Sequence, residues 1–186
     1  MGFTHYWYRK QELDADLFAD YAQDVNRLLS NTSIPLTYME AVQDEWREVN
    51  GFLATPDEIN FNGRGKDSHE TFYFPRILSN TGFTHRNIEI QGLAFGFTKT
   101  ARKPYDVLVV ACLILGILHF GKDSIKVSSD GHIQDWQKGL DLVNNTFRLN
   151  CCLSNDERGD IVVSNNTDTM PVVKNMEDFV DKINSY

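Results

Sequence analysis

The chain has 186 residues, of which 41% are hydrophobic and 12% aromatic, so it can bury a core of its own. Its formal net charge of −8 opposes non-specific binding to nucleic acid and to anionic membranes, and we expect neither as a partner. The N-terminal residues lack the pattern of a secretory signal, and three cysteines (Cys112, Cys151 and Cys152) do not make a disulfide framework. We therefore expect a single domain, residues 1–186, in the reducing cytoplasm.

The first part of the chain predicts strands and helices in mixed order. Aromatic residues and threonine near the N-terminus are typical of a strand, and Asp14 is a typical N-cap for the helix that follows. Phe72 and Phe74 alternate toward one face of a later strand. The elements expected here are strand 3–9, helix 14–29, a short helix over 38–49, strand 58–62, a turn at 63–67 and strand 70–74.

The second part holds one long apolar run, over residues 107–120. The run is shorter than the ~20 residues that span a bilayer, and it is typical of a buried central helix. Pro104 suits the first turn of this helix and Gly121 its end, whereas Asp130 is expected to cap the next helix. The elements expected here are strands near 88–90 and at 95–99, helix 104–120, strand 124–128, helix 130–147, a hairpin around 161–163 and helix 175–183.

Strands and helices that interleave without strict alternation indicate an α+β fold. We expect a mostly antiparallel or mixed sheet with three to four helices packed against it. Polar composition indicates loop or insertion regions near 31–58, 77–94 and 150–172.

The most informative segment places Lys99, Arg102 and Lys103 directly before the helix that begins near Pro104. A helix N-terminus carries unpaired backbone donors and a positive partial charge, so cations there oppose the helix dipole. A phosphate or carboxylate would resolve the conflict, because donors, dipole and cations would all face it. The competing interpretation, of about equal weight, is that Asp106 and other acidic residues neutralise the cations.

Two further segments are weaker candidates for an anion site. Ser128 and Ser129 stand at a strand-to-helix turn, where hydroxyls and backbone donors can bind an anion, but a capping Asp130 favours an ordinary turn. Residues 62–70 carry two glycines and two cations without the spacing of a P-loop, and a hairpin turn explains them well.

The sequence contains no recognisable catalytic or metal-binding motif: HExxH, CxxC pairs and GxSxG are all missing. We therefore expect no metal and no cofactor. His5, inside the first strand, is typical of a hydrogen-bonded core residue. His69 and Glu70 are neighbours on a strand and point to opposite faces, so they do not form an acid–base pair with each other.

Several segments together resemble an uncharacterised family of small bacterial and phage proteins. The resemblance rests on GFTHYW (2–7), HETF with FPR (69–76), KTARKPYD (99–106) and VSSDG with DW (127–136). Phe97 stands where that family carries a cysteine. The resemblance implies no activity, but it implies a context, because phages encode small proteins that capture or destroy the nucleotide signals of bacterial immunity; the chain would then act in the host cytoplasm.

Three hypotheses follow. The first is a binding protein for a small phosphorylated ligand, such as a cyclic nucleotide or another nucleotide immune signal that an anti-defence protein sequesters. Its ligand-binding residues would be Lys99, Thr100, Arg102, Lys103, Ser128, Ser129, Tyr6 and Trp7, with the two aromatic rings stacking on a base.

The alternative is a metal-independent hydrolase, a phosphodiesterase of a small nucleotide, with His5 and His69 as catalytic acid and base. A third class is a protein that binds a basic protein partner; for any of the three, a homodimer is the commonest assembly.

Overall fold

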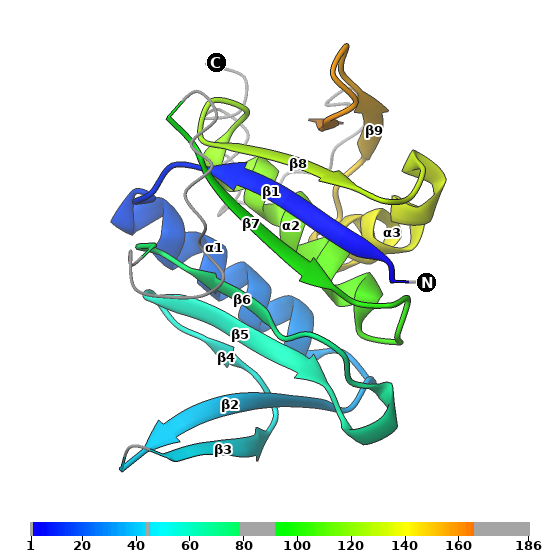
Figure 1. The fold of residues 1–186 in the computed structure, drawn as a ribbon. Helices are drawn as coiled ribbons and strands as arrows, with labels where there is room; N and C mark the ends of the chain where they lie inside the picture. Colours follow the sequence, from blue (N-terminus) through cyan, green and yellow to red (C-terminus); the bar gives the residue numbers. More distant parts are fainter. Residues whose placement is uncertain (1, 44, 79–91, 166–186) are drawn as a thin grey trace.

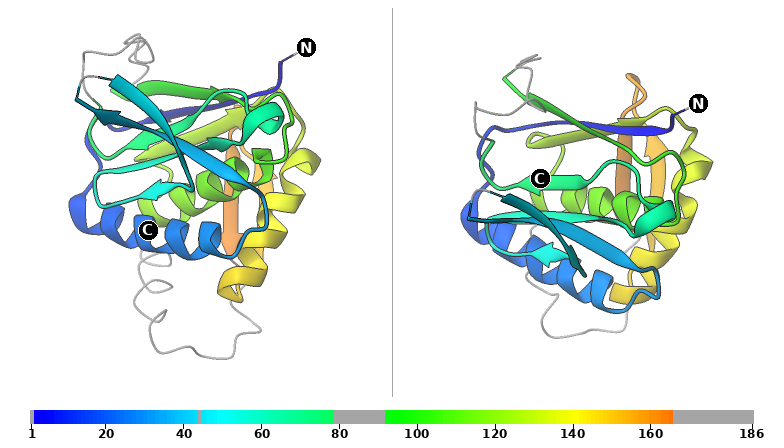
Figure 2. Two further views of the ribbon diagram at one scale, coloured as in Figure 1. Left: turned by 90° about the horizontal axis from the view of Figure 1, so that it is seen from below. Right: turned by 60° about the horizontal axis from the view of Figure 1, so that its bottom comes forward.

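A computed structural model describes residues 2–43, 45–78 and 92–165 of the chain. These residues form three helices and three antiparallel groups of strands, which confirms the expected α+β fold. The strands and helices build successive layers, with α3 and one strand pair at the side (Figures 1 and 2). No helix among the described residues is long and apolar enough to cross a membrane.

The first group is a three-stranded sheet in the order β7-β1-β8, with β1 (Thr4–Arg9) in the centre. β7 (Ala94–Lys99) and β8 (Ile125–Ser129) both pair with it antiparallel. Side chains alternate between the two faces, as the period of a strand requires. The inner face is buried, whereas the outer face carries half-buried aromatic rings.

Trp7 belongs to the inner face of this sheet, with 3% of its surface exposed. Its ring packs against Phe72 and Phe74 and lies over Gly96 of the neighbouring strand, where any Cβ would overlap the indole. The expectation that Trp7 stacks on a ligand base is therefore wrong, because strand alternation turns it into the core while Tyr6 and Tyr8 face outward.

The second group is a five-stranded antiparallel sheet. Its strands are β2 (Leu36–Val42), β3 (Glu45–Asn50), β4 (Leu53–Ala54), β5 (Glu58–Gly63) and β6 (Phe72–Pro75). β5 and β6 form the expected hairpin and bury Phe72 and Phe74. β3 lies at the edge and continues the sheet through β2.

The short helix expected over 38–49 is wrong, because β2 and β3 form a hairpin there. Met39, Glu40 and Ala41 favour a helix by intrinsic preference, but pairing between the two strands decides the conformation. The polar region expected at 31–58 accordingly contains three strands, and the described part of the one at 150–172 contains two. Most of the region expected at 77–94 lies outside the described residues. The expected strand near 88–90 and helix 175–183 lie outside the described residues.

The third group pairs β9 (Cys151–Asn155) with β10 (Ile161–Asn165), which confirms the hairpin expected around 161–163. It contacts α3 (Gln137–Phe147) and α2 (Asp106–Phe120). α2 is apolar on nearly all sides because it lies between α1 (Ala15–Ser30), α3 and the strands. Asp14 caps α1 through the backbone N–H groups of residues 16 and 17, as expected.

Asp130 does not cap a helix. The helical segment begins with a 3-10 turn at Ile133–Trp136, whose N-cap is His132. Asp130 instead accepts hydrogen bonds from the backbone N–H of Thr4 (3.0 Å) and the hydroxyl of Tyr6 (2.7 Å), and so ties the end of β8 to the start of β1.

A buried arginine joins the first two sheets. Arg9, at the end of β1, is 0% exposed, and its guanidinium donates to the carbonyl oxygens of Lys10, Pro75 and Arg76. The guanidinium also lies 4.8 Å from the centre of the Phe74 ring. Burial lowers the pKa of Arg9 to about 9, which leaves it protonated at neutral pH.

Candidate functional site

Two loops that are far apart in the sequence meet beside the start of β1. The backbone N–H of Glu70 donates to the carbonyl of Lys99 (3.1 Å), and the backbone N–H of Lys99 donates to the Glu70 carboxylate (2.9 Å). The ammonium of Lys103 donates to the carbonyl of Lys66 (2.7 Å). Loop 63–70 and loop 99–105 therefore form one surface (Figure 1).

This surface carries more cations than carboxylates, although the protein as a whole is acidic. We call its five cations the basic cluster: Arg64, Lys66, Lys99, Arg102 and Lys103. Residues 62–70 and 99–106 contain these five cations and three carboxylates, and Asp135, which pairs with Arg102, is a fourth carboxylate, whereas the whole chain has a net charge of −8. Lys103 is half-buried and the other four are exposed, so the local field favours an anion over a cation.

The cations of the cluster differ in how firmly the protein holds them. Arg102 makes an ion pair with Asp135, whose two oxygens accept at 2.7 and 3.4 Å, and it stacks 3.8 Å from the centre of the Phe3 ring. The hydrogen bond from Arg102 lowers the pKa of Asp135, and the same contact raises the pKa of Arg102. Lys99 lies 4.0 Å from Glu70, at the limit of an ion pair. Arg102 is thus fixed to the turn that leads into α3, and the Lys103 ammonium is held by the carbonyl of Lys66. Lys99 is the least firmly held of these three cations.

The backbone of loop 99–105 is strained. Ala101 and Arg102 have φ angles of 49° and 56°, a left-handed backbone conformation that residues other than glycine seldom adopt. Such residues persist where the surroundings hold them, and they concentrate at functional sites.

A buried network anchors this strained loop. Asp106, the first residue of α2, accepts hydrogen bonds from the hydroxyl of Thr100 and from Nε2 of His5 (2.9 Å). Thr100 and His5 are both 0% exposed, and the His5 ring packs edge-on against Phe3 and Trp136. Thr100 therefore shapes the loop and does not offer its hydroxyl to a ligand.

The two histidines of the hydrolase hypothesis do not share a pocket. His5 is fully buried, whereas His69 is exposed and its Nδ1 lies 2.9 Å from the carbonyl of Lys99. β1 pairs with β7 and β8, and the strand that follows His69 pairs with β5, so the histidines are not on adjacent strands. His69 joins the edge of the basic cluster instead.

A face of aromatic rings adjoins the basic cluster. Tyr6 and Tyr8 on β1 lie opposite Phe97 and Phe95 on β7, all four on the outer side of the sheet and half-buried. The ammonium of Lys99 lies 5.8 Å from the centre of the Phe97 ring. The aromatic face therefore runs directly to the first cation of the cluster. Tyr6 was predicted from the sequence and the two phenylalanines were not, although their alternation with glycine and threonine in 95–98 is the signal of one shared face.

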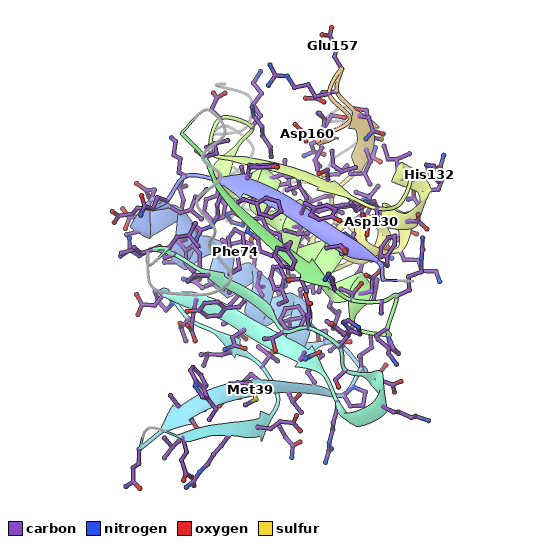
Figure 3. The ribbon with its side chains drawn as sticks, viewed as in Figure 1. Met39, Phe74, Asp130, His132, Glu157 and Asp160 are labelled. Carbon is purple, nitrogen blue, oxygen red and sulfur yellow. The ribbon has the colours of Figure 1, made fainter. Side chains whose placement is uncertain are left out.

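The two serines are separated by the alternation of β8. Ser128 lies opposite Tyr6 in the register and belongs to the outer face. Ser129 faces inward, where its hydroxyl oxygen accepts hydrogen bonds from the indole N–H of Trp136 (3.0 Å) and the backbone N–H of Gly131 (3.2 Å). Figure 3 shows Asp130 beside the start of β1, with His132 farther out in the loop. Ser128 thus stays a candidate ligand residue, and Ser129 holds the turn.

The described residues contain no group of three or more His, Cys, Asp or Glu side chains that could hold a metal ion. A cavity of about 360 Å³ lies between α3 and β9, and one of about 290 Å³ lies against α1; neither is lined by the basic cluster. The cations of the candidate site other than Lys103 are exposed to solvent.

Comparisons with protein-family models, with curated proteins and with solved structures found no match to this chain.

Proposed function

We propose that the chain binds a small phosphorylated ligand at the basic cluster. The observation that carries the proposal is the local reversal of charge, because loops 63–70 and 99–105 gather five cations on a protein whose net charge is −8. Lys99, Lys103 and Lys66 would contact the phosphate.

The neighbouring aromatic face favours a nucleotide over inorganic phosphate. Tyr6 and Phe97 lie opposite each other on adjacent strands, and Lys99 sits at the end of the strand that carries Phe97. A base stacked on these rings would place its phosphate within reach of Lys99. Base stacking contributes about 1–3 kcal/mol in proteins that bind single-stranded nucleic acid, which is enough to select nucleotides.

Capture of the ligand fits this surface better than its hydrolysis. His5 is buried beneath Asp106 and cannot reach a surface ligand, so the acid–base pair of the hydrolase hypothesis loses one member. Sequestration of a nucleotide immune signal, the anti-defence role that the resemblance to phage proteins implies, requires no catalytic group.

The test is to incubate the purified protein with cyclic dinucleotides and ADP-ribose derivatives, remove the protein by filtration, and read both fractions by mass spectrometry after heat denaturation. We expect one nucleotide to leave the filtrate and to return intact on heating. Passage of the whole panel into the filtrate would refute the proposal, and a converted nucleotide would show an enzyme.

Matched lysine variants connect the binding to the cluster. Lys99→Gln and Lys103→Gln each remove one cation that a phosphate would contact, and a charge-assisted hydrogen bond of about 1.5–3 kcal/mol corresponds to a roughly 10–150-fold loss of affinity. Lys122→Gln is the control, because this exposed lysine follows the other end of α2, about 22 Å away. Equal affinities of the three variants would place the ligand elsewhere.

A further inference from the structure

The β2–β3 hairpin exposes the largest apolar side chain on the described surface. Trp46 in β3 has 70% of its surface exposed, whereas Trp7 and Trp136 have 3% and 0%. Five of the six residues of β3 are exposed, and Val49 is half-buried. Figure 1 shows the hairpin at the end of the molecule opposite the β9–β10 pair. Tryptophan is enriched among the residues that dominate the binding energy of protein–protein contacts.

The outer edge of β3 is open for a further strand, since β3 pairs with β2 alone among the described strands. The backbone N–H of Gly51 donates to the carbonyl of Leu36, which makes that cross-strand pair a hydrogen-bonded one. Hydrogen-bonded and non-hydrogen-bonded pairs alternate along the hairpin. The N–H and C=O groups of Trp46 and Glu48 therefore point away from β2, toward the open edge.

Among the antiparallel two-fold registers of β3, one places opposite charges across from each other, whereas a register centred on Val49 has no like-charge pair but forms no ion pair. Two identical antiparallel strands related by a two-fold axis place one residue opposite its own copy. An axis at Arg47 opposes two cations, and an axis at Glu48 opposes two carboxylates; both are unfavourable. An axis at Trp46 places the two tryptophans opposite each other. It also places Glu45 of each copy opposite Arg47 of the other copy, which gives two ion pairs.

From this geometry we propose that two copies of the chain associate through β3, with Trp46 opposite Trp46 of the second copy. The central residues exchange two backbone hydrogen bonds through their outward N–H and C=O groups, and the two sheets become continuous. Glu45 and Arg47 form cross-strand ion pairs on the other face of the sheet. Charges on an edge strand normally prevent pairing with foreign strands, and here they select this one register. The contact is small, so the dimer is a weak one that forms with rising concentration.

The first test uses sedimentation velocity of the full chain from micromolar to millimolar concentration. We expect a concentration-dependent shift from monomer to dimer, with a blue shift of tryptophan emission over the same range. Trp46 reports this change because the other two tryptophans are already buried. A chain that stays monomeric over the whole range overturns the proposal.

The second test is a charge exchange. Glu45→Arg opposes two cations across the interface, because the new guanidinium faces Arg47 of the second copy, and Arg47→Glu opposes two carboxylates. Each variant should therefore weaken the dimer roughly tenfold. An equimolar mixture of the two variants restores both ion pairs and should dimerise as wild type does. The intrachain contact between Glu45 and Arg47 is long (3.8 Å) and exposed, so its loss should cost little. Arg47 also lies opposite Glu40 on β2, so Arg47→Glu adds a like-charge pair within the hairpin, and the stability of this variant is measured beside its dimerisation.

The mixing experiment separates this register from any other use of the hairpin. A dimer that depends on Trp46 but is unaffected by both charge variants overturns the proposed register. So does a mixture that remains as monomeric as its components. Circular dichroism of each variant, unchanged from wild type, ensures that a lost dimer is not a lost fold.

Discussion

Replacing Asp106 by alanine tests the network that anchors the strained loop. Asp106 accepts from Nε2 of His5 and from the hydroxyl of Thr100, and both donors are completely buried. Without the carboxylate, His5 Nε2 has no acceptor among the described residues, whereas Thr100 keeps a long hydrogen bond to the carbonyl of Phe3 (3.5 Å). The variant therefore leaves one buried donor unsatisfied.

The expected loss can be worked out from these contacts. An unsatisfied buried donor costs about 1–3 kcal/mol. The lost carboxylate in the first turn of α2 adds about 0.3–1 kcal/mol, because it no longer offsets the helix dipole. We expect Asp106→Ala to lower the free energy of unfolding by about 2–3 kcal/mol, and the Tm by roughly 4–12 °C for a chain of this size.

Asp106→Asn is the matched variant, because its amide oxygen still accepts from His5 and Thr100 while the charge is gone. Urea unfolding followed by circular dichroism should rank wild type above Asp106→Asn, and Asp106→Asn above Asp106→Ala. In a His5→Phe background, Asp106→Ala should cost less, because the orphaned donor is no longer there. Equal stabilities of the asparagine and alanine variants would refute the reasoning.

Three further predictions concern packing, acid stability and thiol reactivity. Gly139→Ala should lower the free energy of unfolding in urea by about 1–3 kcal/mol, because the added Cβ would overlap a side chain of α2. Asn145→Ala, at an exposed position of the same helix, is the control. Equal losses of stability in the two variants would contradict close packing of α3 against α2. The hydrogen bond from Tyr6 lowers the pKa of Asp130 below its ordinary value of 3.8. The ionised carboxylate therefore stabilises the folded state fully above pH 3.8. This stabilisation is lost as the pH falls through the lower pKa of the folded state. Asp130→Asn should therefore flatten stability against pH below about 4, and an unchanged profile would contradict this. Iodoacetamide at neutral pH should label the exposed Cys152 before Cys151, whose burial raises its pKa to about 11; mass spectrometry showing the reverse order would contradict the fold at β9.

The parts of the fold that could be predicted are those in which one local signal dominates. Helix α2 follows from an apolar run that allows only a buried position, and α1 follows from Asp14 with its apolar stripe. The β5–β6 hairpin follows from alternating phenylalanines on either side of a turn rich in glycine. In each case, the period of the pattern and the flanking residues indicate the same element.

The β2–β3 hairpin could not be predicted because its evidence is not local. Residues 38–49 contain good helix formers, and each strand becomes stable through the pairing of the two strands and the contact of β2 with β5. Its surface is largely exposed, so no buried stripe marks its period.

The candidate site was predictable in its residues but not in their partners. The cations before α2 were recognised from their conflict with the helix dipole, whereas their contact with loop 63–70 depends on tertiary structure alone. Asp135, which holds Arg102, stands 33 positions away in the sequence, so no spacing rule connects the two. The predicted roles of Trp7 and Ser129 were wrong although the information was local. The alternation of side chains along a strand determines which face each residue joins, and it turns both side chains inward.

Arg9 has a consequence for how the molecule assembles. Among the described residues its charge has no carboxylate beside it, and it is solvated by carbonyl oxygens, two of which belong to the end of β6 and the residue after it. If β1 were buried before β6 had packed against it, the Arg9 guanidinium would be buried without the carbonyl oxygens of residues 75 and 76. Burial of a charge without hydrogen-bond partners is strongly unfavourable. Burial of Arg9 therefore depends on the carbonyl oxygens at the end of β6, and the arginine couples the stability of the first sheet to that of the second.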